Sequence, residues 1–449
     1  MSGYAVTDPA TGEVVEEFPL ATDAEVEAAL AAAESAYAAW RTASVADRAA
    51  VVARAARGFR ERAQELAAYA TREMGKSPRA ALGELDLVAE IFEYYAEQGE
   101  TLLADREFRP ASGGRAVVQK RPVGVLLGIM PWNYPYYQVA RFVAPNLVLG
   151  NTLLLKHAPS CPRSALAIAD VLRAAGVPDG VYTNLFLSNE QVATVIADDR
   201  LQGVSLTGSE RAGSAVGELA GRHLKKAVLE LGGSDPLLVL DTEDVAVSAR
   251  TAFGSRMANV GQACNSPKRM IVPESVFQQF VEELVALAQD AATNGRLAPL
   301  ASRAAAEGVH GQIQAAAAAG ATLHTGGELS ETGAFVTPAV LTGVTRDMDL
   351  FHEEVFGPAL VVHAVPDVEA AVRLANDSVY GLGAAVFSSE EDLALSVAER
   401  LDCGMVYVNT AEGSEADLPF GGVKRSGFGR ELGSHGVDEF ANHKLIRLP

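Results

Sequence analysis

The feature that most constrains this chain is an alternation of short apolar runs with helical stretches from residue 123 onward. Runs such as "VGVLLGIM" and "NTLLLK" are β-rich, and helical stretches such as "CPRSALAIADVLRAAG" lie between several of them. Strands that alternate with helices typically form a parallel sheet covered on both faces. A second block of the same kind begins near residue 232. We therefore expect an α/β fold with two doubly wound α/β domains.

The first hundred residues have a different pattern. Residues 22–106 indicate helices, and Thr22 with Glu25 three positions later forms a capping-box sequence before an alanine-rich run. Residues 108–124 then contain a Ser-Gly-Gly turn between polar, strand-like arms, which predicts an exposed hairpin. With 449 residues, the chain is too long for a single hydrophobic core, so two or three structural domains are expected.

Composition excludes several classes of function. The formal net charge of −20 argues against a nucleic-acid partner, whose binding surfaces need concentrated Lys and Arg. No apolar run is long enough to span a membrane, and the N-terminus lacks the basic-then-apolar pattern of a secretory signal. The three cysteines lie far apart, and no Cys/His cluster has metal-ligand spacing. We expect a cytoplasmic protein with no metal site.

Three side chains are candidates for catalysis. Cys264 lies in "NVGQACNSPKR", although a lone cysteine is usually inert packing. Glu230, in "VLELGGSDP", is a carboxylate at the end of an apolar strand, where burial would raise its pKa and make it a usable base; the alternative is a strand-end ion pair. Asn133, in "MPWNYP", can donate to an oxyanion or simply form a turn.

A possible phosphate site follows an apolar strand. The segment "LTGSERAGSAVG" leads from a strand into a helix, whose N-terminal N–H groups can bind phosphate. It lacks the G-x-G-x-x-G spacing, so this signal alone is weak.

Taken together, the motifs resemble the aldehyde dehydrogenase superfamily over nearly the whole chain. The similar segments are "MPWNYP", "LLLKHAPS", "SLTGSERAG", "LELGGSDP", "GQACNSPKR", "EEVFGP" and "PFGGVKRSGFGRE", all in the order of that superfamily. Three of them look most like bacterial succinate-semialdehyde dehydrogenases. The resemblance implies oxidation of a short aldehyde, first of all succinate semialdehyde, through a cysteine thiohemiacetal and thioester.

The resemblance also implies the role of each site residue. Cys264 would be the nucleophile, Asn133 would hold the oxyanion with the Cys264 N–H, and Glu230 would activate water. The expected cofactor contacts are Trp132, Lys156, Ser160, Gly208, Ser209, Leu231, Glu354 and Phe356. The expected substrate contacts are Arg141, Tyr137 and Ser414. An arginine such as Arg141 suits a distal carboxylate, but a structural ion pair is the alternative.

Several positions depart from the family pattern. Many NAD-preferring relatives carry a glutamate where this chain has Pro159, followed by Ser160, so the cofactor is NADP or NAD with NADP favoured. His157 could assist or be a surface residue. Segment 410–417 carries extra carboxylates that would weaken binding of an anionic substrate, and the loop at 293–300 is shortened. Ser266 replaces the second cysteine that some relatives use for a disulfide.

The alternative functions are the same chemistry on another aldehyde, a CoA-acylating enzyme, and a non-catalytic descendant. We expect a homodimer or homotetramer and a small-molecule aldehyde, with no membrane partner. The expected domains are a cofactor-binding domain at 1–107 and 123–231, a catalytic domain at 232–413, oligomerisation elements at 108–122 and 434–449, and a return segment at 414–433 to the cofactor domain.

Overall fold

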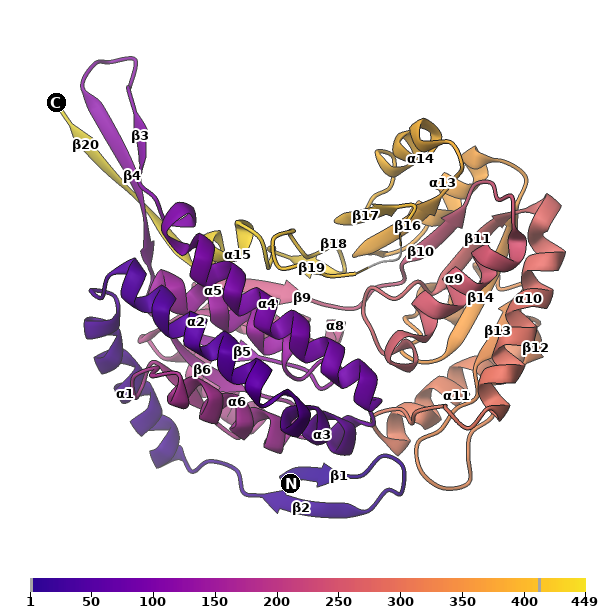
Figure 1. The fold of residues 1–449 in the computed structure, drawn as a ribbon, viewed down its shortest axis with the longest axis horizontal. Coiled ribbons are helices and arrows are strands. Elements are labelled where there is room, and N and C mark those ends of the chain that lie inside the picture. Colours follow the sequence, from indigo (N-terminus) through magenta and orange to yellow (C-terminus); the bar gives the residue numbers. More distant parts are fainter. Residues whose placement is uncertain (1–2, 411–412) are drawn as a thin grey trace.

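The computed structural model, which describes residues 3–410 and 413–449, contains two large sheets, each packed between helices (Figure 1). The indigo-to-magenta part of the chain surrounds one sheet, and the pink-to-orange part surrounds the other. The yellow C-terminal segment runs back from the second sheet across the first. The predicted α/β class with two doubly wound sheets is confirmed.

The first sheet has six strands in the order β19-β9-β8-β5-β6-β7. Five of them, β9, β8, β5, β6 and β7, are parallel to one another. The strands are β5 (Val125–Ile129), β6 (Thr152–Lys156), β7 (Tyr182–Asn184), β8 (Leu201–Thr207), β9 (Lys226–Glu230) and the antiparallel β19 (Gly427–Phe428). The chain winds from β5 toward β7 and then returns to add β8 and β9 on the other side. This reversal beside β5 is where α/β sheets commonly bind ligands.

Helices cover both faces of this sheet. The helices are α1 (Asp23–Trp40), α2 (Val45–Glu61), α3 (Ala63–Met74), α4 (Pro78–Leu102), α5 (Tyr137–Leu149), α6 (Pro162–Ala174), α7 (Asn189–Ala197) and α8 (Glu210–Arg222). Leu126 and Leu153 pack toward α2–α6, whereas Leu127 and Leu154 pack toward α1, α7 and α8. The Thr22 capping box at α1 is present as predicted.

The second sheet has seven strands in the order β12-β13-β14-β11-β10-β16-β17, parallel except for β12. The strands are β10 (Pro236–Val239), β11 (Arg269–Pro273), β12 (Thr322–Thr325), β13 (Ala339–Thr342), β14 (Ala359–Val365), β16 (Gly383–Phe387) and β17 (Met405–Val408). The helices are α9 (Val245–Met257), α10 (Glu274–Thr293), α11 (Arg303–Ala318), α12 (Asp349–His352), α13 (Val368–Asn376) and α14 (Glu391–Ala398). Sequence patterns did not indicate β12 or β13.

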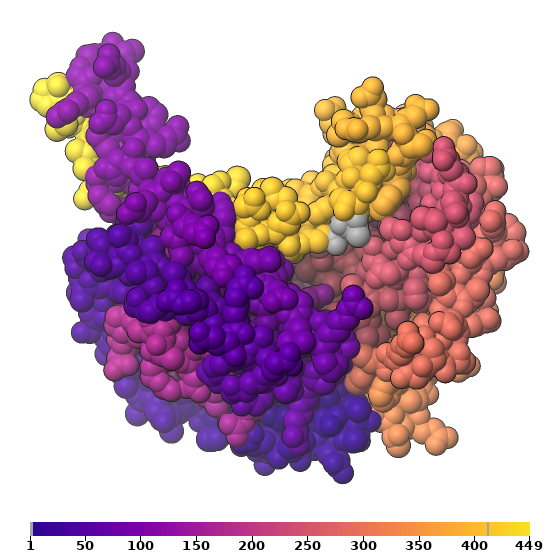
Figure 2. Space-filling model, viewed as in Figure 1, coloured from indigo at the N-terminus to yellow at the C-terminus, as the bar shows by residue number. Residues whose placement is uncertain are grey.

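Smaller elements join and extend the two sheets. They are the hairpin β1 (Tyr4–Thr7) and β2 (Val14–Phe18), the pair β15 (Tyr380–Gly381) and β18 (Val423–Lys424), α15 (His435–Asp438), and the three-stranded arm of β3 (Arg106–Phe108), β4 (Arg115–Pro122) and β20 (Ala441–Leu448). The arm projects from the body of the molecule. In Figure 2 a broad hollow separates the arm from the part of the molecule built around the second sheet. Among the described residues, no helix is long and apolar enough to cross a membrane.

Candidate active site

The site lies where the strands of the first sheet end. Glu230 and Lys156 are the last residues of β9 and β6, and Asn133 lies in the loop between β5 and α5. Because carboxyl ends of parallel strands meet at one sheet edge, these three side chains from distant sequence positions share an edge.

Cys264 lies in a turn between the 3₁₀ helix η1 (Ala258–Gly261) and β11. Asn259, Val260 and Gly261 all have positive φ angles, of 49°, 57° and 76°. This backbone is uncommon, above all for a β-branched residue, so the surroundings must hold it in place. Arg256 does so from α9: its buried guanidinium donates to the carbonyls of Gly261, Val355, Gly357 and Ala359 and to the Ser266 hydroxyl.

Cys264 opens onto a cavity of about 260 Å³. Its polar lining residues are Glu84, Tyr134, Tyr137, Gln138, Ser255, Cys264, Asn265, Ser266 and Ser414. The Tyr137 hydroxyl donates to Ser414 Oγ at 2.8 Å, so these two predicted substrate residues meet at the cavity wall. The structure therefore brings together the predicted nucleophile and two of the three predicted substrate contacts. Residues 411–412 of the unusual segment lie outside the described residues.

The charged groups around Cys264 shift the pKa of its thiol in opposite directions. Burial raises the pKa of the Cys264 thiol to about 12, Arg141 and Lys268 lower that pKa, and Glu354 and Glu230 raise it. The resting group is therefore a thiol whose thiolate fraction increases with pH. Asn133 is 4% exposed, and its Nδ2 donates to the Gln262 carbonyl at 3.1 Å, which ties the predicted oxyanion donor to the Cys264 turn.

Glu230 is buried, and neither of its carboxylate oxygens has a hydrogen-bond partner among the described residues. Burial raises the pKa of Glu230 well above its usual range, while Arg141 lowers it. A side chain at Gly421 would lie 2.5 Å from Glu230 Oε1, so the "PFGG" segment needs glycine where it crosses this carboxylate. An unpartnered carboxylate with a raised pKa has the properties of a general base.

Arg141 lies behind Tyr137 rather than on the cavity wall, and its side chain has no exposed surface. Its Nε pairs with Glu431 Oε2 at 2.9 Å, its Nη1 donates to the Tyr137 hydroxyl at 3.3 Å, and its Nη2 donates to Thr207 Oγ1 at 3.3 Å. The guanidinium also lies 4.7 Å from the centre of the Tyr137 ring. Its charge is thus partly balanced by Glu431, and it reaches the cavity through the Tyr137 hydroxyl.

A wider groove of about 880 Å³ lies beside the N-terminus of α8. Ser209 caps α8, and both Ser209 and Glu354 line this groove. A helix N-terminus favours phosphate, and Arg211 lies beside it, while four glutamates and Arg425 also line the groove. Glycine at position 232 leaves space for the Glu354 carboxylate, because a side chain there would lie 2.5 Å from Glu354 Oε2. These residues fit a dinucleotide.

The other predicted cofactor residues surround the same strand ends. The Trp132 and Phe356 ring centroids lie 5.7 Å apart in an edge-to-face contact. Burial lowers the pKa of Lys156 at the end of β6. Ser160 Oγ lies 3.8 Å from Cys161 Sγ. The Gly208 N–H donates to the Glu230 carbonyl and the Leu231 N–H donates to the Ser426 carbonyl, each at 2.9 Å.

Sequence reasoning missed three residues that hold the site together. Arg256 and Lys268 bind the backbone around Cys264, and Glu431 pairs with Arg141. The basic pair in "NSPKR" was the one available signal, because charged residues next to an apolar strand need buried partners. Nothing in the local sequence identifies their distant partners, which are Val355 for Arg256 and Glu354 for Lys268.

The comparisons with known proteins agree in covering almost the whole chain. Residues 2–446 match a family model described as "Aldehyde dehydrogenase family". A succinate-semialdehyde dehydrogenase [NADP(+)] of Deinococcus radiodurans is 53% identical over 99% of this chain and 94% of its own length, and one of Mycobacterium tuberculosis is 41% identical over 98% and 99%. The structure of succinic semialdehyde dehydrogenase from Streptococcus pyogenes in complex with NADP+ has a TM-score of 0.97 at 40% identity, covering 99% of this chain and 100% of that one.

Proposed function

The chain belongs to the aldehyde dehydrogenase family, and from this premise we propose that it oxidises succinate semialdehyde to succinate with NADP as the cofactor. The observation that carries the proposal is a cavity of about 260 Å³ that is lined both by Cys264 and by the Tyr137–Ser414 hydroxyl pair. Its size suits a short aldehyde. The similarity to enzymes named succinate-semialdehyde dehydrogenase [NADP(+)] supports the substrate and the cofactor.

In the proposed first step, the thiolate form of Cys264 attacks the aldehyde carbon and forms a thiohemiacetal. The carbonyl oxygen becomes an oxyanion, which the Asn133 side-chain amide and the Cys264 backbone N–H stabilise. Asn133 already lies at this turn through its hydrogen bond to Gln262. Positioned donors of this kind are worth about 10²–10³ in rate for each donor.

Bound NADP+ would supply the hydride acceptor for the thiohemiacetal carbon, and Cys264 would keep the resulting acyl group as a thioester. Glu230 then removes a proton from water, which attacks the thioester carbon. As the carbon–sulfur bond breaks, this proton passes to the Cys264 sulfur, so that the carboxylic acid and the thiol are released. The raised pKa of Glu230, caused by burial, makes its carboxylate a stronger base than an exposed glutamate. A base assigned to hydrolysis favours free acid as the product over acylation of CoA.

We assign the cofactor to the groove beside α8. Ser209 and the α8 N-terminus would hold the pyrophosphate, Lys156 and Ser160 the adenosine ribose with its 2′-phosphate, and Glu354 the nicotinamide ribose. Trp132, Gly208, Leu231 and Phe356 would be further contacts of the cofactor at the neighbouring strand ends. Pro159 brings no carboxylate to repel a 2′-phosphate, and the nearby Lys156 supplies a cation.

For the distal carboxylate of the substrate we propose direct contacts from the Tyr137 and Ser414 hydroxyls. Arg141 stands behind them, and its hydrogen bond to the Tyr137 oxygen makes that hydroxyl a better donor. A short neutral aldehyde is the second candidate substrate. It is favoured by the lining of the cavity, in which the described residues include the Glu84 carboxylate but no arginine or lysine.

We propose that the protein is cytoplasmic and that its domains have the boundaries expected from the sequence.

We also propose a homo-oligomer in which the arm of β3, β4 and β20 contacts a second copy of the chain. β20 forms one edge of the arm, and Leu445 on it is 63% exposed. An edge strand with apolar side chains is a surface that a second strand can extend.

The substrate can be tested by initial rates of reduced-cofactor formation. The panel compares succinate semialdehyde with pentanal and butanal, each with NADP and with NAD. We expect kcat/KM for the acidic aldehyde to exceed that for the neutral ones by about a hundredfold, on the order of 3 kcal/mol, and to be higher with NADP. A flat profile across the panel would reject succinate semialdehyde as the substrate.

The proposed carboxylate contact predicts a selective effect of Tyr137→Phe. Removing one hydroxyl that binds a charged group should lower kcat/KM for succinate semialdehyde about 10- to 100-fold and that for pentanal by less than threefold. Tyr134→Phe is the matched control, since Tyr134 lines the same cavity outside the Tyr137–Ser414 pair. Equal losses on both aldehydes would show that Tyr137 acts through packing alone.

A further inference from the structure

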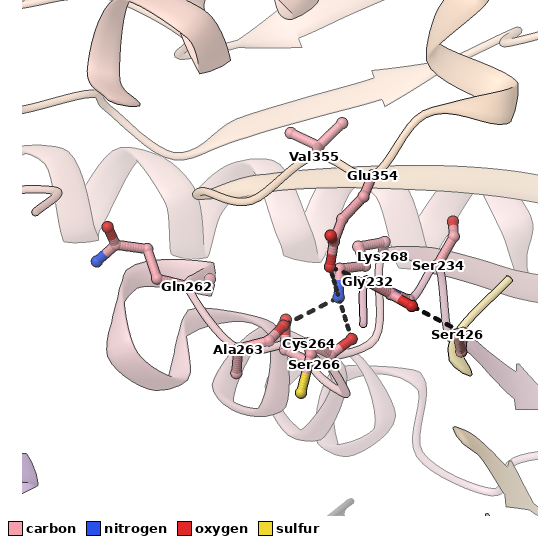
Figure 3. A network of polar contacts seen from close by, with 12 residues as sticks. Gly232, Ser234, Gln262, Ala263, Cys264, Ser266, Lys268, Glu354, Val355 and Ser426 are labelled. Carbon is pink, nitrogen blue, oxygen red and sulfur yellow. Dashed lines mark hydrogen bonds and ion pairs between the residues drawn. The ribbon is translucent and has the colours of Figure 1, made fainter. Parts of the chain in front are cut away.

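Lys268 is a buried cation with no place in the mechanism above. Its side chain is 3% exposed, and its Nζ contacts three acceptors: the Ala263 carbonyl at 2.9 Å, the Cys264 carbonyl at 2.5 Å and Glu354 Oε1 at 3.2 Å. Figure 3 shows Nζ between the Cys264 turn and Glu354. An ammonium group has three N–H donors, so every donor of Lys268 is used at this point.

Two of these acceptors control the orientation of the Cys264 backbone. The Ala263 carbonyl and the Cys264 N–H belong to the same planar trans peptide, so they point in opposite directions. When Lys268 binds the Ala263 oxygen, the Cys264 N–H must point away from Lys268. The bond to the Cys264 carbonyl fixes the next peptide plane as well. Lys268 thereby determines where the proposed backbone oxyanion donor is directed.

Glu354 balances the charge of Lys268 in this buried place. Burying an ammonium group is costly unless it is paired and hydrogen-bonded. Glu354 Oε1 also accepts the Gly233 N–H at 3.1 Å, which fixes the carboxylate. Side chains at Gly232 or Gly233 would lie 2.5 Å from Glu354 Oε2 and 2.6 Å from the Cys264 carbonyl oxygen. The paired glycines of "LELGG" therefore leave the room that this arrangement needs.

We propose that Lys268 is a positioning residue for the reaction, which holds the Cys264 peptide so that its N–H faces the oxyanion, with Glu354 as its counter-charge. The proposal rests on the proposed function for the identity of the oxyanion. A carbonyl oxygen bound by a cation polarises its peptide, so the N–H of that peptide also becomes a stronger donor.

The same cation acts on the thiol. Arg141 and Lys268 lower the pKa of Cys264, whereas Glu354 and Glu230 raise it, and these are the charged groups that act on the sulfur. Removing the Lys268 charge therefore raises the pKa of Cys264 and lowers the thiolate fraction at a given pH. This second effect can be measured without substrate or cofactor.

The test compares Lys268→Met, which keeps the length of the side chain but removes its charge, with Lys225→Met. Lys225 binds a single carbonyl, that of Asp198, at 2.9 Å, far from the site. One readout is the rate of Cys264 alkylation by iodoacetamide between pH 6 and 10 in protein without cofactor, followed on the Cys264 peptide by mass spectrometry. The others are kcat/KM with succinate semialdehyde and NADP, the NADP dissociation constant and the melting temperature.

For folded Lys268→Met we expect an alkylation profile displaced to higher pH and a kcat/KM for succinate semialdehyde about 100-fold lower at saturating NADP. Values within threefold of Lys225→Met in both readouts would overturn the proposal. If Lys268→Met does not fold, Lys268→Arg decides: a wild-type alkylation profile with kcat/KM at least tenfold lower supports the positioning role, and wild-type values in both reject it. Should the wild type oxidise no aldehyde, the proposed function fails, while the alkylation profiles still test the action of Lys268 on Cys264.

Discussion

At the residue scale, His157 illustrates how burial changes an expectation. Of the two alternatives for the histidine after "LLLK", a surface position is wrong, since His157 has no exposed surface. Its Nε2 contacts the Pro135 carbonyl at 2.8 Å and its Nδ1 accepts the Ala158 N–H at 2.7 Å. The neutral ring thereby fastens the loop that carries Asn133 to the end of β6.

His157 predicts a loss of stability in acid. Burial lowers the pKa of His157 to about 4 in the folded chain, against about 6.5 when unfolded, so unfolded chains bind the proton more readily. The stabilisation is complete above pH 6.5 and is lost as the pH falls toward 4, by up to about 3 kcal/mol. Urea unfolding from pH 7.5 to 4.5 should show a steeper decline for wild type than for His157→Gln. Parallel declines would rule out this contribution.

At the element scale, the turn that carries Cys264 depends on close backbone approach as well as on handedness. Gly261 has a φ of +76°, and a side chain there would lie 2.3 Å from the Gly357 carbonyl oxygen. Gly295 has a similar φ of +70° but no atom within 4 Å of that position. The two glycines therefore separate the cost of the left-handed conformation from the cost of a collision.

We expect Gly295→Ala to lose about 1–2 kcal/mol of stability, the cost of the left-handed conformation, with kcat/KM unchanged. Gly261→Ala should lose more stability and about 100-fold in kcat/KM, because the collision moves the Cys264 turn by a fraction of an ångström or more. Thermal unfolding measures the loss of stability in both variants, and initial rates measure the loss of kcat/KM. Similar losses in the two variants would mean that handedness alone matters.

At the scale of the whole molecule, the arm of β3, β4 and β20 exposes apolar side chains that no other part of the described chain covers. It carries Phe108, Leu445 and Ile446, which are 43%, 63% and 36% exposed. β20 pairs with β4 over its whole length and forms one of the two edges of this small sheet. A projecting sheet with apolar side chains gains stability from a second copy.

The arm predicts the effect of charge on assembly. Leu445→Lys should lower the molar mass in light scattering from a multiple of 47.1 kDa toward that of one chain, because burying an unpaired ammonium in a contact is unfavourable. Leu224→Lys is the control, as Leu224 is 93% exposed on the body of the molecule. An unchanged molar mass for Leu445→Lys would show that the contact between copies lies elsewhere or that the wild-type protein is a monomer.

The sequence by itself determined the local elements and the type of chemistry. Apolar runs separated by helices predicted the strands from β5 to β9, and the Thr22 capping box predicted the start of α1, because both signals are local. The ordered motifs predicted the aldehyde dehydrogenase family, which is confirmed. The roles of Cys264, Glu230 and Asn133 stay predictions that the variants above can test.

Only the tertiary structure decided which side chains meet. Arg141 meets Glu431 across 290 positions of the chain, and Lys268 meets Glu354 across 86, and no local pattern records either contact. The partner of a buried charge is selected by the strand order and by the room left at glycines such as Gly232. Burial is likewise a property of the packed whole, which is why the buried, neutral His157 became apparent only in the folded chain. The burial of Glu230 was expected from its apolar strand, and the fold added that its carboxylate has no hydrogen-bond partner among the described residues.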